Sequence, residues 1–204
     1  MPSIVLATGN RGKIRELEAT LAKTHPDIRI LGLTDFPEIG DIPETGETFS
    51  ENAQQKAEAV CRHTNLISLA DDSGLVVPAL NGEPGIYSAR YSGARASDAD
   101  NNQKLLQKMA GFKNEQRKAY FYCVLTACAP NGALISAEGQ WSGRIAGSPR
   151  GDNGFGYDPL FVDPEKGCTA AQMTNEEKLK RSHRSKALHG LLDLWPEFWQ
   201  RANS

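Results

Sequence analysis

Residues 3–21 have the sequence SIVLATGNRGKIRELEATL, and this stretch decides which kind of fold to expect. It begins with a short run of residues that favour β-structure, SIVLA, followed by a turn at residues 8–13. The apolar residues Ile14, Leu17 and Leu21 then recur at helical spacing. The chain is therefore predicted to open with a strand, a turn and a helix.

The remaining sequence continues this mixture of strands and helices. The patterns first predict a helix from Thr48 to about His63, a strand over 66–70 that ends at Asp71-Asp72-Ser73-Gly74, and an extended run over 75–80. They then predict a helix over 97–109, strands over 119–129 and 134–145 joined by a Pro-Asn-Gly turn, a short strand over 159–162, and a helix over about 175–193. Such an order suggests an α/β or α+β fold with a mixed sheet, of which we expect the mixed α/β class. Because no Pro/Gly/Ser linker interrupts it, we expect a single domain over residues 1–204 with a cleft.

Composition limits the class of protein. The 204 residues include 23 Lys+Arg and 25 Asp+Glu, a net charge of −2, which argues against a protein that mainly coats nucleic acid. This balance still allows a locally basic site for one phosphorylated molecule. No apolar run approaches a membrane span, and the four cysteines form no C-x-x-C pair. We therefore expect reduced thiols, a cytoplasmic location, and neither nucleic acid nor membrane as partner.

The turn at residues 8–13 is the first candidate binding site. Arg11 and Lys13 lie at the expected positive end of a helix dipole, where cations are unfavourable unless an anion lies between them. Free backbone N–H groups at a helix start would complete a phosphate site. The pattern is not a Walker A loop. A solvated basic helix start is the alternative.

Acidic residues supply the second candidate. Asp71 and Asp72 follow an apolar strand, and neighbouring side chains of a strand point to opposite faces, so at most one of them faces a given cleft. One of them could hold Mg²⁺ or orient a water molecule, together with Glu44 from a preceding loop. The alternatives are an Asp-Ser-Gly turn and a solvated glutamate, with Lys56 as a surface charge.

The third candidate combines the glycine-rich loop at residues 151–159 with the last predicted helix. Phe155 or Tyr157 could cover a planar base, while Lys178, His183 and Arg184 could bind an anionic or polar ligand. The alternatives are aromatic side chains in the core, a core histidine and solvated cations.

Taken together, these segments resemble the inosine/xanthosine triphosphate pyrophosphatase family. The matching stretches are ATGNRGKIREL at 7–17, ETGETFSENAQQKA at 44–57, ADDSGL at 70–75, GEPGIYSARYSG at 82–93, GFGYDPLF at 154–161, and Lys178 with SHR at 182–184. The resemblance implies an elongated mixed β-sheet with flanking helices that form two lobes around a deep substrate cleft, and a homodimer. It also implies hydrolysis of ITP, dITP or XTP to the monophosphate and pyrophosphate.

The resemblance further implies roles for individual residues. Asp72 would accept the proton of the attacking water and bind Mg²⁺ with Glu44, and Asp71 is a further candidate ligand of metal or water. Substrate contacts are implied for Thr8, Gly9, Asn10, Arg11, Gly12, Lys13, Lys56, Ser73, Phe155, Gly156, Tyr157, Asp158, Lys178, His183 and Arg184. Donors from His183, Arg184 or the backbone would recognise the 6-oxygen of the base. The alternatives are a pyrimidine-directed or septum-related pyrophosphatase and a non-catalytic nucleotide-binding protein.

Overall fold

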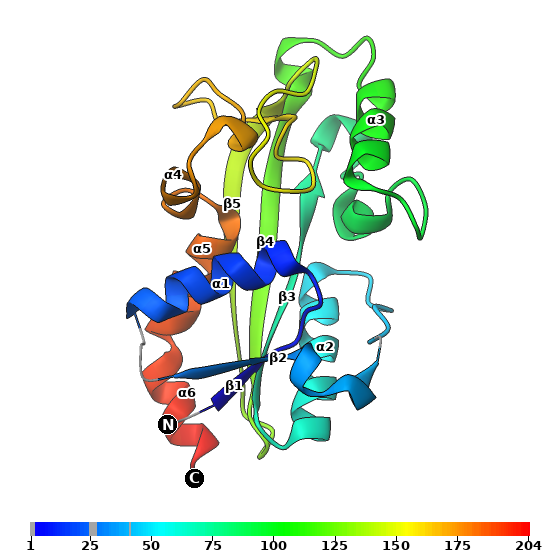
Figure 1. Ribbon diagram of the computed structural model, residues 1–204. Coiled ribbons are helices and arrows are strands. Elements are labelled where there is room, and N and C mark those ends of the chain that lie inside the picture. Colours follow the sequence, from blue (N-terminus) through cyan, green and yellow to red (C-terminus); the bar gives the residue numbers. More distant parts are fainter. Residues whose placement is uncertain (1–2, 25–27, 41) are drawn as a thin grey trace. The chain divides into compact units, whose positions relative to one another are not determined.

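The computed structural model of the protein describes residues 3–24, 28–40 and 42–204 (Figure 1). Its strands form one mixed sheet in the order β2-β1-β3-β4-β5-β6. Strand β1 is parallel to both β2 and β3, whereas β5 and β6 are antiparallel. Strands β4 and β5 are neighbours joined by the predicted Pro130-Asn131-Gly132 turn, so they are also antiparallel, because parallel neighbours need a long crossover. The predicted mixed α/β class is confirmed.

The elements have the following bounds. The strands are β1 (Ser3–Leu6), β2 (Arg29–Gly32), β3 (Ile67–Val76), β4 (Lys118–Cys128), β5 (Leu134–Ile145) and β6 (Phe161–Val162). The α-helices are α1 (Arg11–Thr24), α2 (Phe49–Thr64), α3 (Asp98–Lys108), α4 (Asn175–Leu179), α5 (His183–Asp193) and α6 (Trp195–Ala202). Short 3₁₀ helices occupy Leu33–Asp35, Pro37–Ile39, Pro78–Leu80, Gly85–Arg90, Asn114–Arg117 and Ala170–Gln172.

The chain divides into two compact units. The first contains Met1–Asp72, Cys123–Gly139 and Arg184–Ser204, and the second contains Ser73–Tyr122 and Gln140–His183. Three boundaries fall within β3, β4 and β5, and the fourth falls after His183, the first residue of α5, so each of these elements contributes residues to both units. The single domain with a deep cleft between two lobes stays a prediction.

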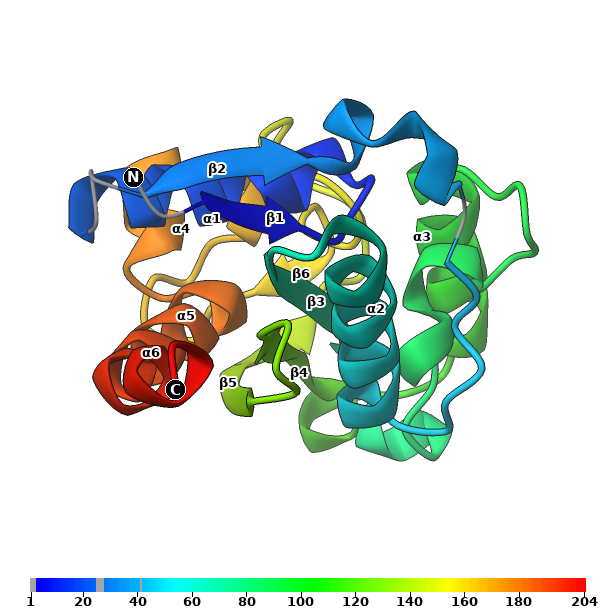
Figure 2. The ribbon, with the colours of Figure 1, turned by 90° about the horizontal axis from the view of Figure 1, so that it is seen from below.

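In the first unit, helices cover both faces of the sheet. Ile4 and Leu6 of β1 pack in a core cluster with residues of α1, α5 and α6, whereas Val5 and Ala7 pack in a second cluster with residues of α2. Figure 2 shows α5 and α6 on one side of the strands and α2 on the other. Because side chains alternate along a strand, the apolar run of β1 supplies both clusters.

The second unit has its own core. Its cluster includes Leu75 of β3, Leu105 of α3, Trp141 of β5 and Phe161 of β6. The guanidinium of Arg117 donates hydrogen bonds to four backbone carbonyl groups of this unit, at Met109, Phe112, Ile145 and Ala146. This side chain therefore ties the end of α3 to the end of β5.

Several local predictions are confirmed. Helix α2 begins after Thr48, whose hydroxyl accepts from the N–H of Glu51, and α3 begins after Ser97, whose hydroxyl accepts from the N–H of Asp100. Each is a capping box that satisfies N–H groups the helix leaves unpaired.

None of the four cysteines forms a disulfide bond. In the described part of the chain, no helix combines the length and the apolar character that crossing a membrane requires.

Strand β3 departs from its prediction. It was expected to end at Asp71-Asp72-Ser73-Gly74, with a separate extended run from Leu75, but it continues without a break to Val76. The glycine that suggested a turn has another purpose, because a Cβ atom at Gly74 would collide with the carbonyl oxygen of Gly85 and with the side chain of Ser88. The Ser88 hydroxyl also accepts from the N–H of Leu75 at 2.9 Å, so Gly74 allows a close approach of neighbouring backbone.

The predicted helix over 175–193 is also corrected. It is broken into α4 and α5, separated by residues 180–182. The guanidinium of Arg181, in this break, pairs with Asp163 and Glu165. Ser182 directly precedes α5 and is of a type favoured at helix N-caps. Lys178 therefore lies in the last turn of α4, where the helix dipole favours a cation.

We predict that Gly74→Ala lowers the free energy of unfolding by about 1–3 kcal/mol, the usual cost of overpacking. The matched control is Gly147→Ala, since a Cβ atom at Gly147 would meet nothing within 4 Å. Urea unfolding followed by circular dichroism measures both variants. Equal stability of the two variants would contradict the packing argument.

Candidate active site

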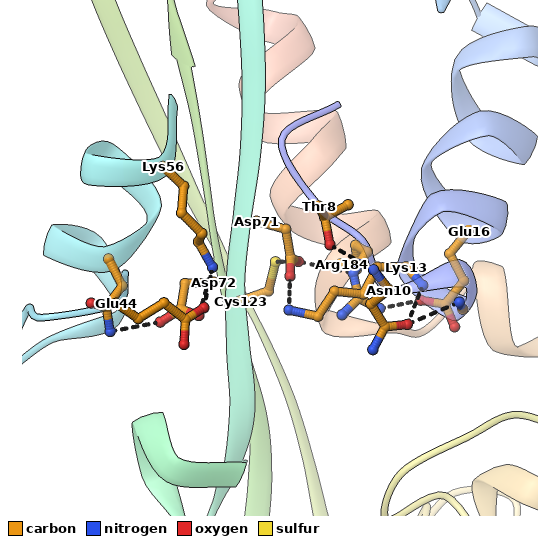
Figure 3. Close-up of polar contacts among 12 residues, drawn as sticks. Thr8, Asn10, Lys13, Glu16, Glu44, Lys56, Asp71, Asp72, Cys123 and Arg184 are labelled. Atoms are coloured by element: carbon orange, nitrogen blue, oxygen red, sulfur yellow. Dashed lines mark hydrogen bonds and ion pairs between the residues drawn. The ribbon is translucent and has the colours of Figure 1, made fainter. Parts of the chain in front are cut away.

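The two aspartates of β3 point to opposite faces of the strand, as the sequence predicted (Figure 3). Asp72 faces Lys56 and Glu44, while Asp71 faces Lys13 and Arg184. This arrangement continues the alternation of β3, in which Leu69 belongs to the cluster of α1 and α5 and Ala70 to that of α2. Successive carboxylates therefore take part in two separate polar groups.

On the α2 face, one ammonium group joins two carboxylates. Nζ of Lys56 lies 2.7 Å from Oε1 of Glu44 and 3.1 Å from Oδ1 of Asp72. Lys56 is buried, so the alternative of a surface charge is wrong. Burial by itself would lower the pKa of Lys56, but the carboxylates of Asp72 and Glu44 outweigh it and raise that pKa.

Asp72 itself is buried, and this burial raises the pKa of its carboxyl group despite the opposing charges of Lys56 and Lys13. A higher pKa makes a carboxylate a stronger proton acceptor. The other oxygen, Oδ2, accepts a hydrogen bond of 3.2 Å from the amide of Asn52. The group at Asp72 is therefore held in place from two positions on α2.

Asn52 is a residue that the sequence prediction missed. Besides donating to Asp72, its amide oxygen accepts from the backbone N–H of Gly46 at 2.8 Å. The backbone N–H of Glu47 donates to Glu51 at 2.7 Å, so the loop that carries Glu44 is tied to the first turns of α2. The available signal was the spacing of Asn52 and Lys56, four residues apart on one helix face.

Glu44 and Asp72 could hold a divalent metal ion. Both present carboxylate oxygens, the ligands that Mg²⁺ prefers, and both already converge on one cation, the ammonium of Lys56. Among the residues that the structure describes, no group of three or more His, Cys, Asp or Glu residues could hold a metal. Mg²⁺ commonly keeps several water or phosphate oxygens as ligands, so two protein carboxylates fit it.

On the opposite face, Asp71 is fully buried among positive charges. Its carboxylate forms an ion pair with Lys13, accepts from Nε of Arg184 at 2.9 Å, and accepts from the thiol of Cys123 at 3.0 Å. Burial would raise the pKa of Asp71, but Arg184 and Lys13 hold it well below its usual value. Asp71 is therefore a carboxylate in the folded protein.

Arg184 connects this group to α1. Its side chain is buried, and its Nη1 pairs with the carboxylate of Glu16 while its Nε pairs with Asp71. The alternative of a solvated charge is therefore wrong. Glu16 was missed by the sequence prediction, although its position three residues after Lys13 on one helix was a usable signal.

The turn before α1 differs from its prediction in one respect. The backbone N–H groups of Gly12 and Lys13 are not free, because both donate to the side-chain oxygen of Asn10, at 2.9 and 3.2 Å. The N–H of Asn10 in turn donates to the hydroxyl of Thr8 at 3.2 Å. Asn10 therefore satisfies N–H groups at the helix start in the way an N-cap residue does.

In the second unit, Asp158 organises part of the glycine-rich loop. Its carboxylate pairs with Nζ of Lys178 at 2.6 Å and accepts from the backbone N–H of Phe155 at 2.9 Å. The same ammonium lies 4.8 Å from the centre of the Phe155 ring. Gly156 is held by α3, where Asp98 accepts from its N–H at 2.6 Å and Asn102 donates to its carbonyl at 2.8 Å.

Two aromatic candidates of this unit are buried in its interior. Tyr157 belongs to the apolar core cluster, and its hydroxyl donates to the carbonyl of Ser88 at 2.9 Å. The ring of His183 stacks on Phe121, with ring centres 4.8 Å apart. Phe155 is half-buried, so it is the more accessible of the two aromatic side chains in the loop.

The sequence-predicted residues thus fall into two sets, one in each unit. The first unit holds Thr8, Gly9, Asn10, Arg11, Gly12, Lys13, Glu44, Lys56, Asp72 and Arg184. The second unit holds Ser73, Phe155, Gly156, Tyr157, Asp158, Lys178 and His183. Within each set the lysines, and Arg184 in the first set, are paired with carboxylates. That one substrate contacts both sets stays a prediction.

We predict that Arg184→Met lowers the free energy of unfolding at pH 7 by about 3–5 kcal/mol, because it leaves the buried carboxylate of Asp71 without one of its cations. The pKa of Asp71 is lowered in the folded protein, so its ion pairs stabilise the fold above the unfolded value of about 4 and lose this effect at lower pH. The difference between the variant and the wild type should therefore shrink below about pH 4. Urea unfolding at several pH values measures it, and a constant difference would contradict the role of Asp71.

Comparison with known proteins identifies the family of this chain. The chain matches the family model described as Ham1 family over residues 4–194. It is 52% identical to a dITP/XTP pyrophosphatase of Nitratidesulfovibrio vulgaris, with 97% of this chain and 98% of that protein covered. It is 48% identical to a protein of the same name from Geobacillus kaustophilus, with 97% and 96% covered.

Solved structures give the same result. The Ham1 protein of Coxiella burnetii superposes with a TM-score of 0.87 at 42% identity, covering 97% of this chain and 100% of that one. The Ham1 protein of Staphylococcus aureus superposes with a TM-score of 0.85 at 42% identity, covering 96% and 98%. The family match, the relatives and the solved structures together show that this chain belongs to the Ham1 family.

Proposed function

We propose that this protein hydrolyses the non-standard purine nucleoside triphosphates ITP, dITP and XTP to the monophosphate and pyrophosphate, and so removes them from the nucleotide pool. The observation that carries the proposal is the group formed by Glu44, Lys56 and Asp72, in which two carboxylates share one cation. A protein that only binds nucleotides has no need of a water-activating carboxylate. The relatives named dITP/XTP pyrophosphatase support the choice of substrate.

The triphosphate carries several negative charges that the site must neutralise. In our proposal Lys13, Lys56 and Lys178 supply positive charge, and the turn at residues 8–13 contributes to binding the phosphates. Mg²⁺ held by Glu44 and Asp72 would supply further charge neutralisation and bring the phosphate oxygens into position. Positioning and charge stabilisation account for most of the catalysis of phosphoryl transfer.

The chemical step is attack of water at the α-phosphorus. The water oxygen forms a bond to that phosphorus while the bond from the phosphorus to the bridging oxygen of the β-phosphate breaks. Asp72 accepts the proton of the water, and pyrophosphate leaves with the bonding electrons. The raised pKa of Asp72 suits this role, and Asn52 and Lys56 keep its carboxylate oriented.

Specificity rests on the 6-position of the base. ITP and XTP carry an oxygen acceptor there, whereas adenine carries an amino donor. Donors from His183, Arg184 or the backbone near Phe155 pair with the oxygen, and adenine leaves them unpaired, which is costly in a buried site. Ser73, Gly156, Tyr157 and Asp158 complete the proposed substrate contacts.

Three further features belong to the proposal: dependence on Mg²⁺, a homodimer, and a cytoplasmic location. The pair of carboxylates supports the first. The resemblance to the family supports the dimer, and four free thiols suit a reducing compartment.

Our first functional prediction concerns substrates. With Mg²⁺, ITP and XTP should be hydrolysed at least ~100-fold more efficiently than ATP, because adenine leaves polar groups of the site unpaired. Pyrophosphate should be released, which coupled inorganic pyrophosphatase detects, and chelation by EDTA should stop the reaction until Mg²⁺ is restored. Preference for CTP would instead favour a pyrimidine-directed enzyme, and release of orthophosphate without the coupling enzyme would contradict the proposal.

Our second functional prediction concerns the proton acceptor. Asp72→Asn should lower kcat for ITP by ~10²-fold or more, the scale of general-base catalysis, while circular dichroism shows a folded protein. Asp71→Asn should lower kcat less, since Asp71 lies on the other face of β3. Unchanged kcat in Asp72→Asn would remove this residue from the chemistry.

A further inference from the structure

We propose that Asp71 is a positioning residue for Lys13, acting together with Arg184 and Glu16, and that it is not a ligand of the metal. The inference rests on the proposed function, in which Lys13 binds phosphate. It assigns a role to the one strand carboxylate whose purpose the sequence left open.

Both oxygens of Asp71 already have partners. Oδ1 pairs with the ammonium of Lys13, and Oδ2 accepts from Nε of Arg184 at 2.9 Å and from the thiol of Cys123 at 3.0 Å. The side chain has an exposed fraction of 0%. Glu44 approaches the opposite face of the strand (Figure 3), so Asp71 cannot complete a metal site with it.

The guanidinium of Arg184 holds α1 and β3 together. Its Nη1 pairs with Glu16 of α1 and its Nε pairs with Asp71 of β3. Glu16 lies three residues after Lys13, on the same side of α1. Because a guanidinium is planar and its donors have fixed directions, this bridge sets where the backbone of Lys13 lies relative to β3.

Lys13 is thereby attached at two points. Its backbone is held through Glu16 and Arg184, and its ammonium is held by Asp71. An ammonium group has three hydrogen-bond donors. Among the described residues, the ammonium of Lys13 has a single polar partner, Asp71, so two of its donors remain for an anion. The side chain keeps 15% of its surface exposed. A lysine that is already fixed loses less conformational freedom when it binds a phosphate.

The net charge of the four side chains allows the change in ITP binding on removal of the Asp71 charge to distinguish positioning from electrostatic attraction. Lys13 and Arg184 balance Asp71 and Glu16, so the four charges sum to zero. Removing the charge of Asp71 makes the group net positive, and electrostatic attraction alone would then improve the binding of a triphosphate. Loss of positioning has the opposite effect, because the ammonium is no longer held in place.

The test is steady-state hydrolysis of ITP by Asp71→Asn, with Mg²⁺ saturating. We expect KM for ITP to rise about tenfold while kcat changes less than about threefold, since positioning of a phosphate ligand is what is lost. In a Lys13→Met background, adding Asp71→Asn should raise KM by less than about twofold, because the residue through which Asp71 acts is already absent. The concentration of Mg²⁺ that gives half-maximal rate should stay the same.

The matched control is Asp163→Asn. Asp163 is also a buried aspartate, and its carboxylate accepts from Trp141 at 2.9 Å and pairs with Arg181 at 3.2 Å. This variant should leave KM for ITP unchanged even where thermal unfolding shows a loss of stability. If Asp71→Asn does not fold, Glu16→Gln serves in its place, because it loosens the bridge and keeps the pair of Asp71 and Lys13; KM should again rise.

Three results would overturn the inference alone: a KM for ITP that stays the same or falls, additive effects of Asp71→Asn and Lys13→Met, or a higher Mg²⁺ requirement that marks Asp71 as a metal ligand. Absence of ITP and XTP hydrolysis by the wild-type protein would overturn the proposed function, and the inference with it.

Discussion

The rest of the structure depends on compensating two buried negative charges, the carboxylates of Asp71 and Asp72 on adjacent residues of β3. A buried ionised carboxylate is costly unless a cation and hydrogen-bond donors surround it. Because neighbouring side chains of a strand point to opposite faces, one helix cannot satisfy both. Lys56 of α2 therefore forms an ion pair with Asp72 on one face, while Lys13 of α1 and Arg184 of α5 form ion pairs with Asp71 on the other. These cations therefore belong to the same helices that cover the two faces of the sheet in the first unit.

The cations that stabilise the fold are also the ones proposed to meet the phosphates. Lys56 bridges Glu44 and Asp72, and Lys13 pairs with Asp71, so each is already placed and oriented before a ligand arrives. The second unit uses the same principle, since Lys178 is held by Asp158, which also fixes the backbone of Phe155. Such preorganisation lowers the entropy lost on binding and keeps charged groups in position as the reaction proceeds. The cost is that charge-removing changes at these positions affect folding as well as activity.

Much of the fold could be predicted because its signals are local. A capping box marks the start of a helix through hydrogen bonds within four residues, and Thr48, Ser97 and Thr174 form such boxes at the starts of α2, α3 and α4. A Pro-Asn-Gly turn between two apolar runs predicts a hairpin, as observed between β4 and β5. Strand β2 and helix α6 were not predicted, and two predictions were wrong, the end of β3 and the continuity of the last helix, where contacts distant in sequence outweighed local preference. Gly74 suits a turn in isolation, but a neighbouring segment at Gly85 and Ser88 keeps it in a strand.

The sequence by itself determined the class of fold, the family, and the identity of nearly all the candidate residues, because these depend on residue type and order along the chain. Only the tertiary structure decided which charges meet. Glu16 and Arg184 are far apart in the sequence, and no periodicity or spacing relates them, yet they form one ion pair. Likewise Asn52 and Cys123 became part of the site through contacts with Asp72 and Asp71. Pairing of buried charges depends on distance in space. This distance is set when helices pack on the sheet, so no single segment of the sequence predicts it.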